Sequence, residues 1–233
     1  MNPLEAYKEG KVLLIDKPLE WTSFDVVNKV RWLLKRHFGI KKIKVGHAGT
    51  LDPLATGLLI LCVGKFTKKI ETYQAQEKEY TGTFTLGATT PSYDLETEID
   101  QFFDLSEITE EKIHEATQQF IGAIEQRPPI FSALKKDGKR LYELARAGEK
   151  VEVPKRMVSI TEFEITNIDL PTVSFRVVCS KGTYIRSLAH DFGKSLDNGA
   201  HLSALRRTRI GEFKVDDAVV VEEFEKELEK CQN

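Results

Sequence analysis

The segment from residue 46 to 57 combines closely spaced glycines with a single acidic residue, and it leads directly into an apolar run. Its sequence is Gly-His-Ala-Gly-Thr-Leu-Asp-Pro-Leu-Ala-Thr-Gly, and the apolar run covers residues 58–63. Glycines at this density allow unusual backbone angles or a close approach of the backbone to another group. The proline after Asp52 favours extended backbone at that residue and disfavours a helix. We therefore predict a rigid loop that presents Asp52 and leads into a buried strand.

Two interpretations of this loop are open from its residues alone. In one, Asp52 forms an Asx turn and bonds only its own backbone. In the other the loop is functional, since loops held on a rigid scaffold often bind substrates or catalyse reactions. The mixture of glycine, histidine, aspartate and threonine favours the second. His47 is then a candidate base or stacking group. A metal ligand is not expected there, because no second His or Cys follows at ligand spacing.

Length and composition describe a chain with a substantial core. The 233 residues suit one large domain that mixes helices and strands. The longest apolar run has six residues, too few to span a bilayer, and the first eleven residues do not resemble a signal peptide. The three cysteines, Cys62, Cys179 and Cys231, are far apart in the sequence. We expect no disulfide framework and a reducing, cytoplasmic location, with Cys62 and Cys179 as buried thiols in apolar, strand-like runs.

The net charge of −2 conceals a separation of charges along the chain. Acidic residues gather in segments 94–115 and 212–230. Four groups of basic residues lie in segments 31–44, 65–69, 135–140 and 206–209. One interpretation is a set of unrelated solvated loops. The other, which we favour, is a basic face that attracts a nucleic acid.

The order of the expected elements predicts an α+β fold. Thr22 and Asp25 have the spacing of a capping box, and Phe24, Val27, Val30 and Leu34 would form the apolar face of a helix ending near residue 37. Further helices are expected at 67–76, 109–121 and 183–196, with strands at 12–15, 58–63, 79–86, 158–168 and 173–179. Residues 210–230 are expected to form a strand and then an acidic helix. This irregular order favours α+β over regular βαβ winding.

A second candidate segment is Lys-Gly-Thr-Tyr-Ile-Arg at residues 181–186. A glycine after a strand, followed by an arginine in the first helical turn, would place the Arg186 guanidinium near a strand end. Such a group could pair with Asp52 and keep that carboxylate ionised. Tyr80 begins another strand, and it could either stack on a nucleic-acid base or serve as an ordinary strand residue.

Together these motifs resemble the TruB family of pseudouridine synthases. The resemblance rests on segments 46–57, 78–80 and 181–186, and it extends to 14–18, 132–135, 199–202 and 205–207. It covers residues 12–210, which is nearly the whole chain. It implies isomerisation of uridine-55 in the T-loop of tRNA to pseudouridine.

The resemblance also implies roles for individual residues. Asp52 would be the catalytic aspartate, Tyr80 would stack on the flipped base and assist proton transfer, and Arg186 would pair with Asp52. Among the remaining substrate-binding candidates, His47 would fill the space left by the flipped base, and Asp94 would contact the extruded nucleotide. Tyr184 and Leu205 would line the base pocket. Lys17 is a further substrate-binding candidate.

The resemblance implies a mixed, largely antiparallel sheet flanked by helices, in a single catalytic domain over residues 1–233. Residues 105–154 would form an inserted lobe that grips RNA, and 211–233 a short acidic extension without a PUA domain. Glu20 departs from the usual glycine of the family, which makes the local turn an open question. No cofactor, metal or obligatory protein partner is expected, and we expect a monomer.

Two alternatives keep part of this interpretation. The same chemistry could act on a stem-loop of another RNA. A protein that binds and remodels tRNA would use a similar basic face but would not need an ion-paired acid such as Asp52.

Overall fold

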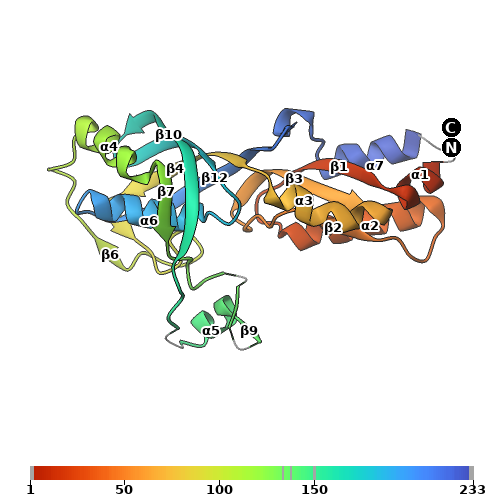
Figure 1. Ribbon diagram of the computed structural model, residues 1–233, viewed down its shortest axis with the longest axis horizontal. Helices are drawn as coiled ribbons and strands as arrows, with labels where there is room; N and C mark the ends of the chain where they lie inside the picture. Colours follow the sequence, from red (N-terminus) through yellow and green to blue (C-terminus); the bar gives the residue numbers. More distant parts are fainter. Residues whose placement is uncertain (1–2, 133, 137, 149–150, 231–233) are drawn as a thin grey trace. The chain divides into compact units, whose positions relative to one another are not determined.

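The computed structural model describes residues 3–132, 134–136, 138–148 and 151–230 (Figure 1). Ala133 of the 132–135 motif and Cys231 lie outside these residues. The chain divides into two compact units. Unit 1 comprises Met1–Tyr80 and Leu205–Asn233, and unit 2 comprises Thr81–Ala204. The divisions fall inside two strands, β4 and β12.

Unit 1 is built around the buried strand β3. Its elements are α1 (Pro3–Glu9), β1 (Lys11–Lys17), α2 (Ser23–Phe38), β2 (Val45–His47), β3 (Ala55–Val63), η1 (Gly64–Lys69), α3 (Ile70–Ala75), the start of β4 (Lys78–Leu86), the end of β12 (Ala200–Ile210), β13 (Phe213–Lys214), η3 (Val215–Asp217) and α7 (Val221–Lys230). Strands β1 and β2 pair antiparallel with β3, whereas β12 runs parallel to it.

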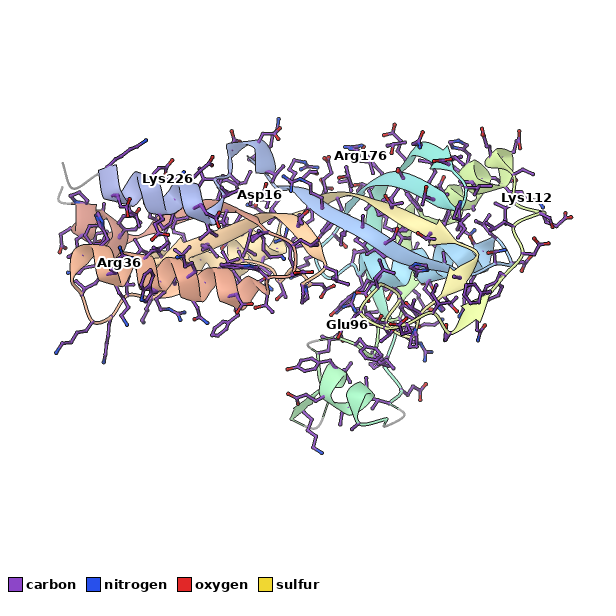
Figure 2. The ribbon with its side chains drawn as sticks, turned by 180° about the vertical axis from the view of Figure 1, so that it is seen from behind. Asp16, Arg36, Glu96, Lys112, Arg176 and Lys226 are labelled. Carbon is purple, nitrogen blue, oxygen red and sulfur yellow. The ribbon has the colours of Figure 1, made fainter. Side chains whose placement is uncertain are left out.

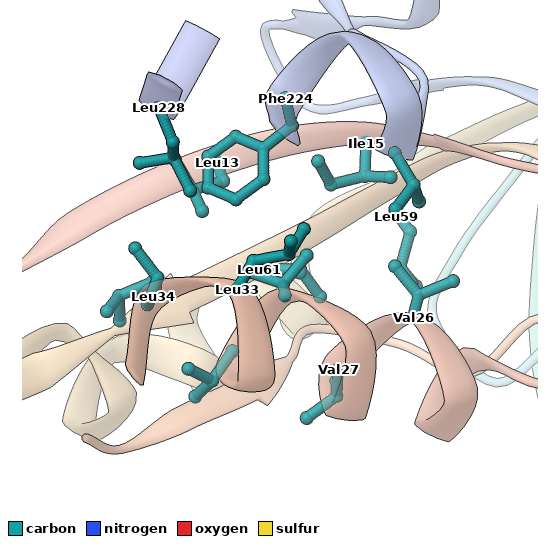
Figure 3. Packing of buried hydrophobic residues seen from close by; sticks show 14 of the residues in the cluster. Leu13, Ile15, Val26, Val27, Leu33, Leu34, Leu59, Leu61, Phe224 and Leu228 are labelled. Atoms are coloured by element: carbon teal, nitrogen blue, oxygen red, sulfur yellow. The ribbon is translucent and has the colours of Figure 1, made fainter. Parts of the chain in front are cut away.

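Both faces of β3 are covered, which explains why its sequence is continuously apolar. On one face, Leu59 and Leu61 pack against α2 and α7 through residues such as Leu33 and Phe224 (Figure 3). The opposite face of the strand packs under η1 and α3, where Leu58, Ile60 and Cys62 meet Phe66 and Ile70. The acidic helix α7 therefore has an apolar face in the main core of unit 1.

Unit 2 is a sheet with an aromatic core. Its elements are the rest of β4 and β12, β5 (Ala88–Thr89), β6 (Gln101–Phe102), α4 (Glu110–Thr117), η2 (Gln118–Phe120), β7 (Gly122–Gln126), β8 (Lys135–Lys136), β9 (Lys139–Arg140), α5 (Leu141–Arg146), β10 (Arg156–Asp169), β11 (Thr172–Cys179) and α6 (Ile185–Ser195). Strand β10 pairs antiparallel with both β11 and β7. The rings of Phe84 and Phe175 stack at 4.1 Å, and Phe192 of α6 packs beside them.

The predicted α+β class, with a largely antiparallel sheet flanked by helices, is confirmed. The capping box is also confirmed. The Thr22 hydroxyl accepts from the Asp25 backbone N–H at 3.1 Å, and the Asp25 carboxylate accepts from the Thr22 N–H at 2.9 Å. The residues of the predicted strands 12–15, 58–63, 79–86, 158–168 and 173–179 lie in β1, β3, β4, β10 and β11.

Several local predictions are wrong. Phe24 is 60% exposed, whereas Val27, Val30 and Leu34 are buried as predicted, together with Val26 and Leu33. Strand β12 was expected only from residue 210 but begins at Ala200. The glycine loop is shorter than residues 46–57, since β2 ends at His47 and β3 begins at Ala55. The expected helices 67–76 and 109–121 each include a 3-10 segment.

The segment expected to form an inserted lobe, 105–154, contributes to two parts of unit 2. Strand β7 joins the sheet beside β10, and α4 packs on β10. Strands β8 and β9 pair, and helix α5 has a small apolar cluster of its own, formed by Leu141, Leu144 and Val153. Its expected role in gripping RNA remains a prediction.

Candidate active site

Asp52 lies in the short loop that joins β2 to β3 in unit 1. Its side chain is partly exposed, while Leu51 before it is buried. The Asp52 carbonyl accepts from the Ala55 N–H at 3.1 Å, so β3 begins three residues after the carboxylate. The predicted arrangement, an acid on a loop leading into a buried strand, is confirmed.

The first residue of helix α2 holds the backbone next to Asp52. Ser23 is 2% exposed, and its hydroxyl accepts from the Leu51 N–H at 2.8 Å. The same hydroxyl lies 3.2 Å from the Leu51 carbonyl, to which it donates. Both backbone groups of Leu51 therefore bond to one buried side chain, which fixes the peptide planes on either side of this residue.

A buried arginine holds the other side of the loop. Arg207 on β12 is 1% exposed and donates from Nε to the Leu58 carbonyl at 2.8 Å. Its two terminal nitrogens donate to the Gly49 and Thr50 carbonyls at 3.1 and 3.4 Å. The backbone of Arg207 also lies against Gly57, where a Cβ atom would be 2.3 Å from the Arg207 carbonyl oxygen. Only glycine fits there, and its φ of +104° is a second reason.

Lys17 at the end of β1 is fully buried beneath the same loop. Its ammonium donates to the carbonyls of Trp21, Pro18 and Pro53 at 2.6, 2.8 and 3.4 Å. Burial lowers the pKa of Lys17 to about 8, although the negative charge of Asp52 opposes this shift. The side chain therefore ties the turn before α2 to the residue after Asp52 and places a positive charge near that carboxylate.

The turn before α2 resolves the question raised by Glu20. Glu20 has a φ of +66°, in the left-handed region that suits glycine. Its N–H donates to the Pro53 carbonyl at 2.8 Å, so the strained residue itself bonds the Asp52 loop. The turn therefore forms without glycine.

Three more predicted residues lie in unit 1. His47 ends β2, and burial together with the nearby charge of Arg207 lowers its pKa, which favours a neutral imidazole. Its Nδ1 is buried and has no hydrogen-bond partner in the described part of the chain. Tyr80 is buried in β4 at 9% exposure. Leu205 on β12 is the register partner of Ala55, the first residue of β3.

The other predicted residues lie in unit 2. Arg186, the second residue of α6, is 3% exposed, and its Nε lies 3.6 Å from the Asp94 carboxylate. A terminal nitrogen of Arg186 also donates to the Ser92 carbonyl at 3.4 Å. Asp94 is 4% exposed and accepts from the Glu96 N–H at 3.0 Å. The structure thus places Asp94 against Arg186, a contact that the sequence did not predict.

Tyr184 is held by its backbone just before α6. The Gln126 side chain is 1% exposed, and it accepts from the Tyr184 N–H at 2.8 Å and donates to the Tyr184 carbonyl at 3.0 Å. The Arg156 guanidinium lies 4.7 Å from the centre of the Tyr184 ring. Asp52 and Arg186 belong to different units, so the pairing expected between them remains a prediction.

The fourth basic group, Arg206, Arg207 and Arg209, is bonded to other parts of unit 1. Arg206 pairs with Asp16 through two bonds of 3.0 and 2.7 Å. Arg209 lies 3.1 Å from Glu77, and Arg207 is buried as described above. All three arginines therefore have partners within the protein, and the RNA contact expected of this group remains a prediction.

The described residues offer few alternative chemistries. They contain no group of three or more His, Cys, Asp or Glu side chains arranged to hold a metal ion. Cys62 and Cys179 are buried free thiols, as predicted, and burial raises the pKa of Cys62 to about 11. Among the described helices, none has both the length and the apolar character needed to span a bilayer.

Comparison with known proteins identifies the family. Residues 35–185 match the model of the TruB family pseudouridylate synthase N-terminal domain. Residues 186–233 match the model of the tRNA pseudouridylate synthase B C-terminal domain. The chain belongs to the TruB family. It is therefore a pseudouridine synthase, an isomerase, as its motifs indicated.

Relatives of this TruB-family chain are similar over almost their whole length. A tRNA pseudouridine synthase B of Flavobacterium johnsoniae is 64% identical, over 98% of this chain and 100% of that protein. One from Phocaeicola vulgatus is 57% identical, over 96% of this chain and 95% of that protein.

Solved structures show the same fold. The crystal structure of a Cbf5–Nop10–Gar1 complex matches with a TM-score of 0.70 and 32% identity, over 96% of this chain and 57% of that chain. An H/ACA RNP bound to a substrate RNA containing 2′-deoxyuridine matches with a TM-score of 0.70 and 29% identity, over 97% of this chain and 55% of that chain. This chain thus spans little more than half of those longer chains.

Proposed function

We propose that this chain converts uridine-55 in the T-loop of tRNA to pseudouridine, with Asp52 as the catalytic residue. The observation that supports this most strongly is the way the Asp52 loop is held. Ser23, Arg207 and Lys17 are buried and bond the loop backbone, while the Asp52 side chain remains partly exposed. A carboxylate on a fixed backbone beside a buried ammonium is suited to act on a substrate in a defined geometry.

The reaction rearranges one nucleotide and needs no other reactant. The bond between N1 of uracil and C1′ of the ribose breaks with the help of Asp52. The ring then turns, C5 forms the new bond to C1′, the proton on C5 leaves and N1 takes up a proton. Because the target base starts inside the folded T-loop, it must first be flipped out of its stack, at a cost of a few kcal/mol.

The other site residues receive roles in this proposal. Tyr80 stacks on the flipped uracil and assists removal of the C5 proton. Arg186, oriented by Asp94 at 3.6 Å, pairs with Asp52 and keeps it ionised. Tyr184 and Leu205 line the base pocket. His47, whose Nδ1 is buried without a bond among the described residues, occupies the position that the base leaves.

The relatives support tRNA as the substrate, because proteins named tRNA pseudouridine synthase B match this chain end to end. The proposal places the enzyme in the cytoplasm as a monomer, without an obligatory protein partner, metal or cofactor.

Tritium release from tRNA transcripts labelled at C5 of uridine tests the proposal. Wild-type protein should release tritium from a tRNA with uridine at position 55 and not from one with cytidine there. Asp52→Asn should reduce release to background, whereas Asp104→Asn, an exposed acid in unit 2, should not. Tight binding without release would indicate a remodelling protein, and release from another RNA alone would indicate a different target.

A further inference from the structure

The outer face of helix α2 is both aromatic and basic. Phe24 is 60% exposed and Trp32 is 49% exposed, eight residues apart on a helix of 16 residues. At a rise of about 1.5 Å per residue they lie about 12 Å apart along the axis. Lys35, one turn beyond Trp32, is also exposed. Exposed aromatic rings together with exposed cations are the combination of groups that can bind a single-stranded nucleic acid.

The Trp32 ring is held in place. The Lys29 ammonium and the Arg36 guanidinium each lie 5.0 Å from the centre of the ring. Both cations also reach the Glu225 carboxylate on α7, at 3.2 and 3.7 Å, so they are anchored (Figure 2 labels Arg36). An aromatic ring held half-exposed between two anchored cations has little conformational freedom left to lose on binding. The entropy cost of binding a ligand is therefore small.

The basic character continues beyond the helix. Lys41, Lys42 and Lys44 in the loop after α2 are exposed, and like Lys35 they make no ion pair with acids in the described part of the chain. The Lys44 carbonyl accepts from the Gly64 N–H at 2.9 Å, so this loop runs beside η1. No acidic residue occurs in the sequence between Asp25 and Asp52.

The α2 surface, which we define as Phe24, Trp32, Lys35, Lys41, Lys42 and Lys44, begins at the catalytic loop. Ser23, directly before Phe24, bonds Leu51. The helix, about 24 Å long, leads away from that loop, and the basic segment after it returns through β2 to His47. A polyanion that extends from Asp52 along α2 would therefore meet cations over the second half of the helix, from Lys29 onward, and in the loop after it.

We propose that the α2 surface binds part of the substrate RNA outside the stem-loop that contains the target uridine. The lysines contact phosphates, and Trp32 stacks on an unpaired base. This chemistry matches single-stranded or irregular RNA, where cations follow the backbone and rings stack on bases. A protein is a less suitable partner for this surface. A group of lysines that make no ion pairs is complementary to a polyanion of uniform charge, such as an RNA backbone. The proposal rests on the proposed function, because it takes tRNA as the substrate.

The test compares two RNAs that cannot be turned over, because cytidine replaces the target uridine. One is the full-length tRNA transcript and the other is its isolated T-arm hairpin. Dissociation constants are measured over a range of salt concentrations for wild type and for the combined variant Lys35→Gln, Lys41→Gln, Lys42→Gln and Lys44→Gln. A second variant, Trp32→Ala, tests stacking. Matched controls are Lys226→Gln on the acidic helix α7 and Phe102→Ala, which removes an aromatic ring that is 80% exposed in unit 2.

We expect the lysine variant to bind full-length tRNA with a salt slope smaller by about 2 to 3, as for the loss of three to four phosphate contacts. Trp32→Ala should weaken binding of full-length tRNA roughly tenfold, the loss of one stacked base. The lysine variant and Trp32→Ala should bind the hairpin as tightly as wild type does. The two control variants should bind both RNAs as tightly as wild type does. Equal losses on both RNAs would overturn the proposal and place the contact within the stem-loop. No loss on either RNA would exclude RNA binding at this surface.

Binding is measured without catalysis, so failure of this proposal is distinct from failure of the proposed function. The four lysines are exposed, and circular dichroism of each variant checks that it folds. The proposed function would fail only if wild-type protein did not modify tRNA at position 55.

Discussion

Replacing Ser23 with alanine removes a single atom that holds the backbone beside Asp52. The Ser23 hydroxyl bonds both the N–H and the carbonyl of Leu51, at 2.8 and 3.2 Å, and Leu51 is only 4% exposed. Water has little access to replace these bonds. A buried backbone group left without a partner costs about 1–3 kcal/mol. Ser23→Ala leaves two such groups without a partner, and the better helix propensity of alanine offsets about 0.5 kcal/mol of the cost. We therefore expect the free energy of unfolding to fall by about 3 kcal/mol.

The same change should affect catalysis through the position of Asp52. Freed from Ser23, the loop can shift, and a displacement near 1 Å reduces rates about a hundredfold. We therefore expect Ser23→Ala to lower the single-turnover rate on tRNA by about ten- to a hundredfold, with little change in RNA affinity. Urea unfolding followed by circular dichroism measures the stability. Ser106→Ala, which removes an exposed hydroxyl bonded to Asp104, is the control. A stability loss under 0.5 kcal/mol with an unchanged rate would show that Ser23 does not hold the Asp52 loop.

Three further predictions concern the same loop. Arg207→Lys should destabilise the protein by about 3 kcal/mol, because one lysine cannot donate to the carbonyls of Leu58, Gly49 and Thr50 at the same time. In the same urea titration, the control Arg209→Lys should lower the free energy of unfolding by less than about 1 kcal/mol. Glu20→Gly should raise the free energy of unfolding by about 0.5–1 kcal/mol, since it relieves a positive φ, and an unchanged or lower midpoint would contradict this. Because the folded pKa of Lys17 is lowered from 10.5 to about 8, the unfolded chain binds more protons between these values. Stability relative to Lys17→Met should therefore rise from pH 8 to pH 10.5, and a flat difference would show that the pKa is not lowered.

Local sequence signals predicted elements whose cause is itself local. The capping box at Thr22 and Asp25 needs only residues three apart, and it forms as expected. The run of residues 58–63 predicted a buried strand, because a strand covered on both faces is apolar throughout. Phe24 failed as a core residue, since spacing alone does not show which side of a helix faces the sheet.

The missed features depend on residues far apart in the chain. Strand β12 contains four charged or polar residues in succession, Arg206 to Arg209, and so lacks the apolar alternation of a strand. Each arginine is satisfied by a partner at least 130 residues away, such as Leu58 for Arg207, 149 positions away. The Arg186–Asp94 contact likewise joins residues 92 positions apart. Only the fold shows which partners within the protein these charges have.

The same distinction explains which part of the site the sequence could predict. Asp52 stood out because its neighbours Gly49, Pro53 and Gly57 indicate a constrained loop. Ser23 and Arg207, which hold that loop, carried no separate signal. A buried serine at a helix start resembles any capping residue, and an arginine in a basic segment resembles a phosphate contact. Their roles follow from burial and from the atoms that they bond.

The first measurement to make is a map of pseudouridine in a tRNA transcript after incubation with the wild-type protein. Carbodiimide labelling and primer extension locate each pseudouridine to one nucleotide. We expect one new stop, at the position that reports residue 55, and no such stop with Asp52→Asn. A stop at another position, or the same stop with Asp52→Asn, would contradict it.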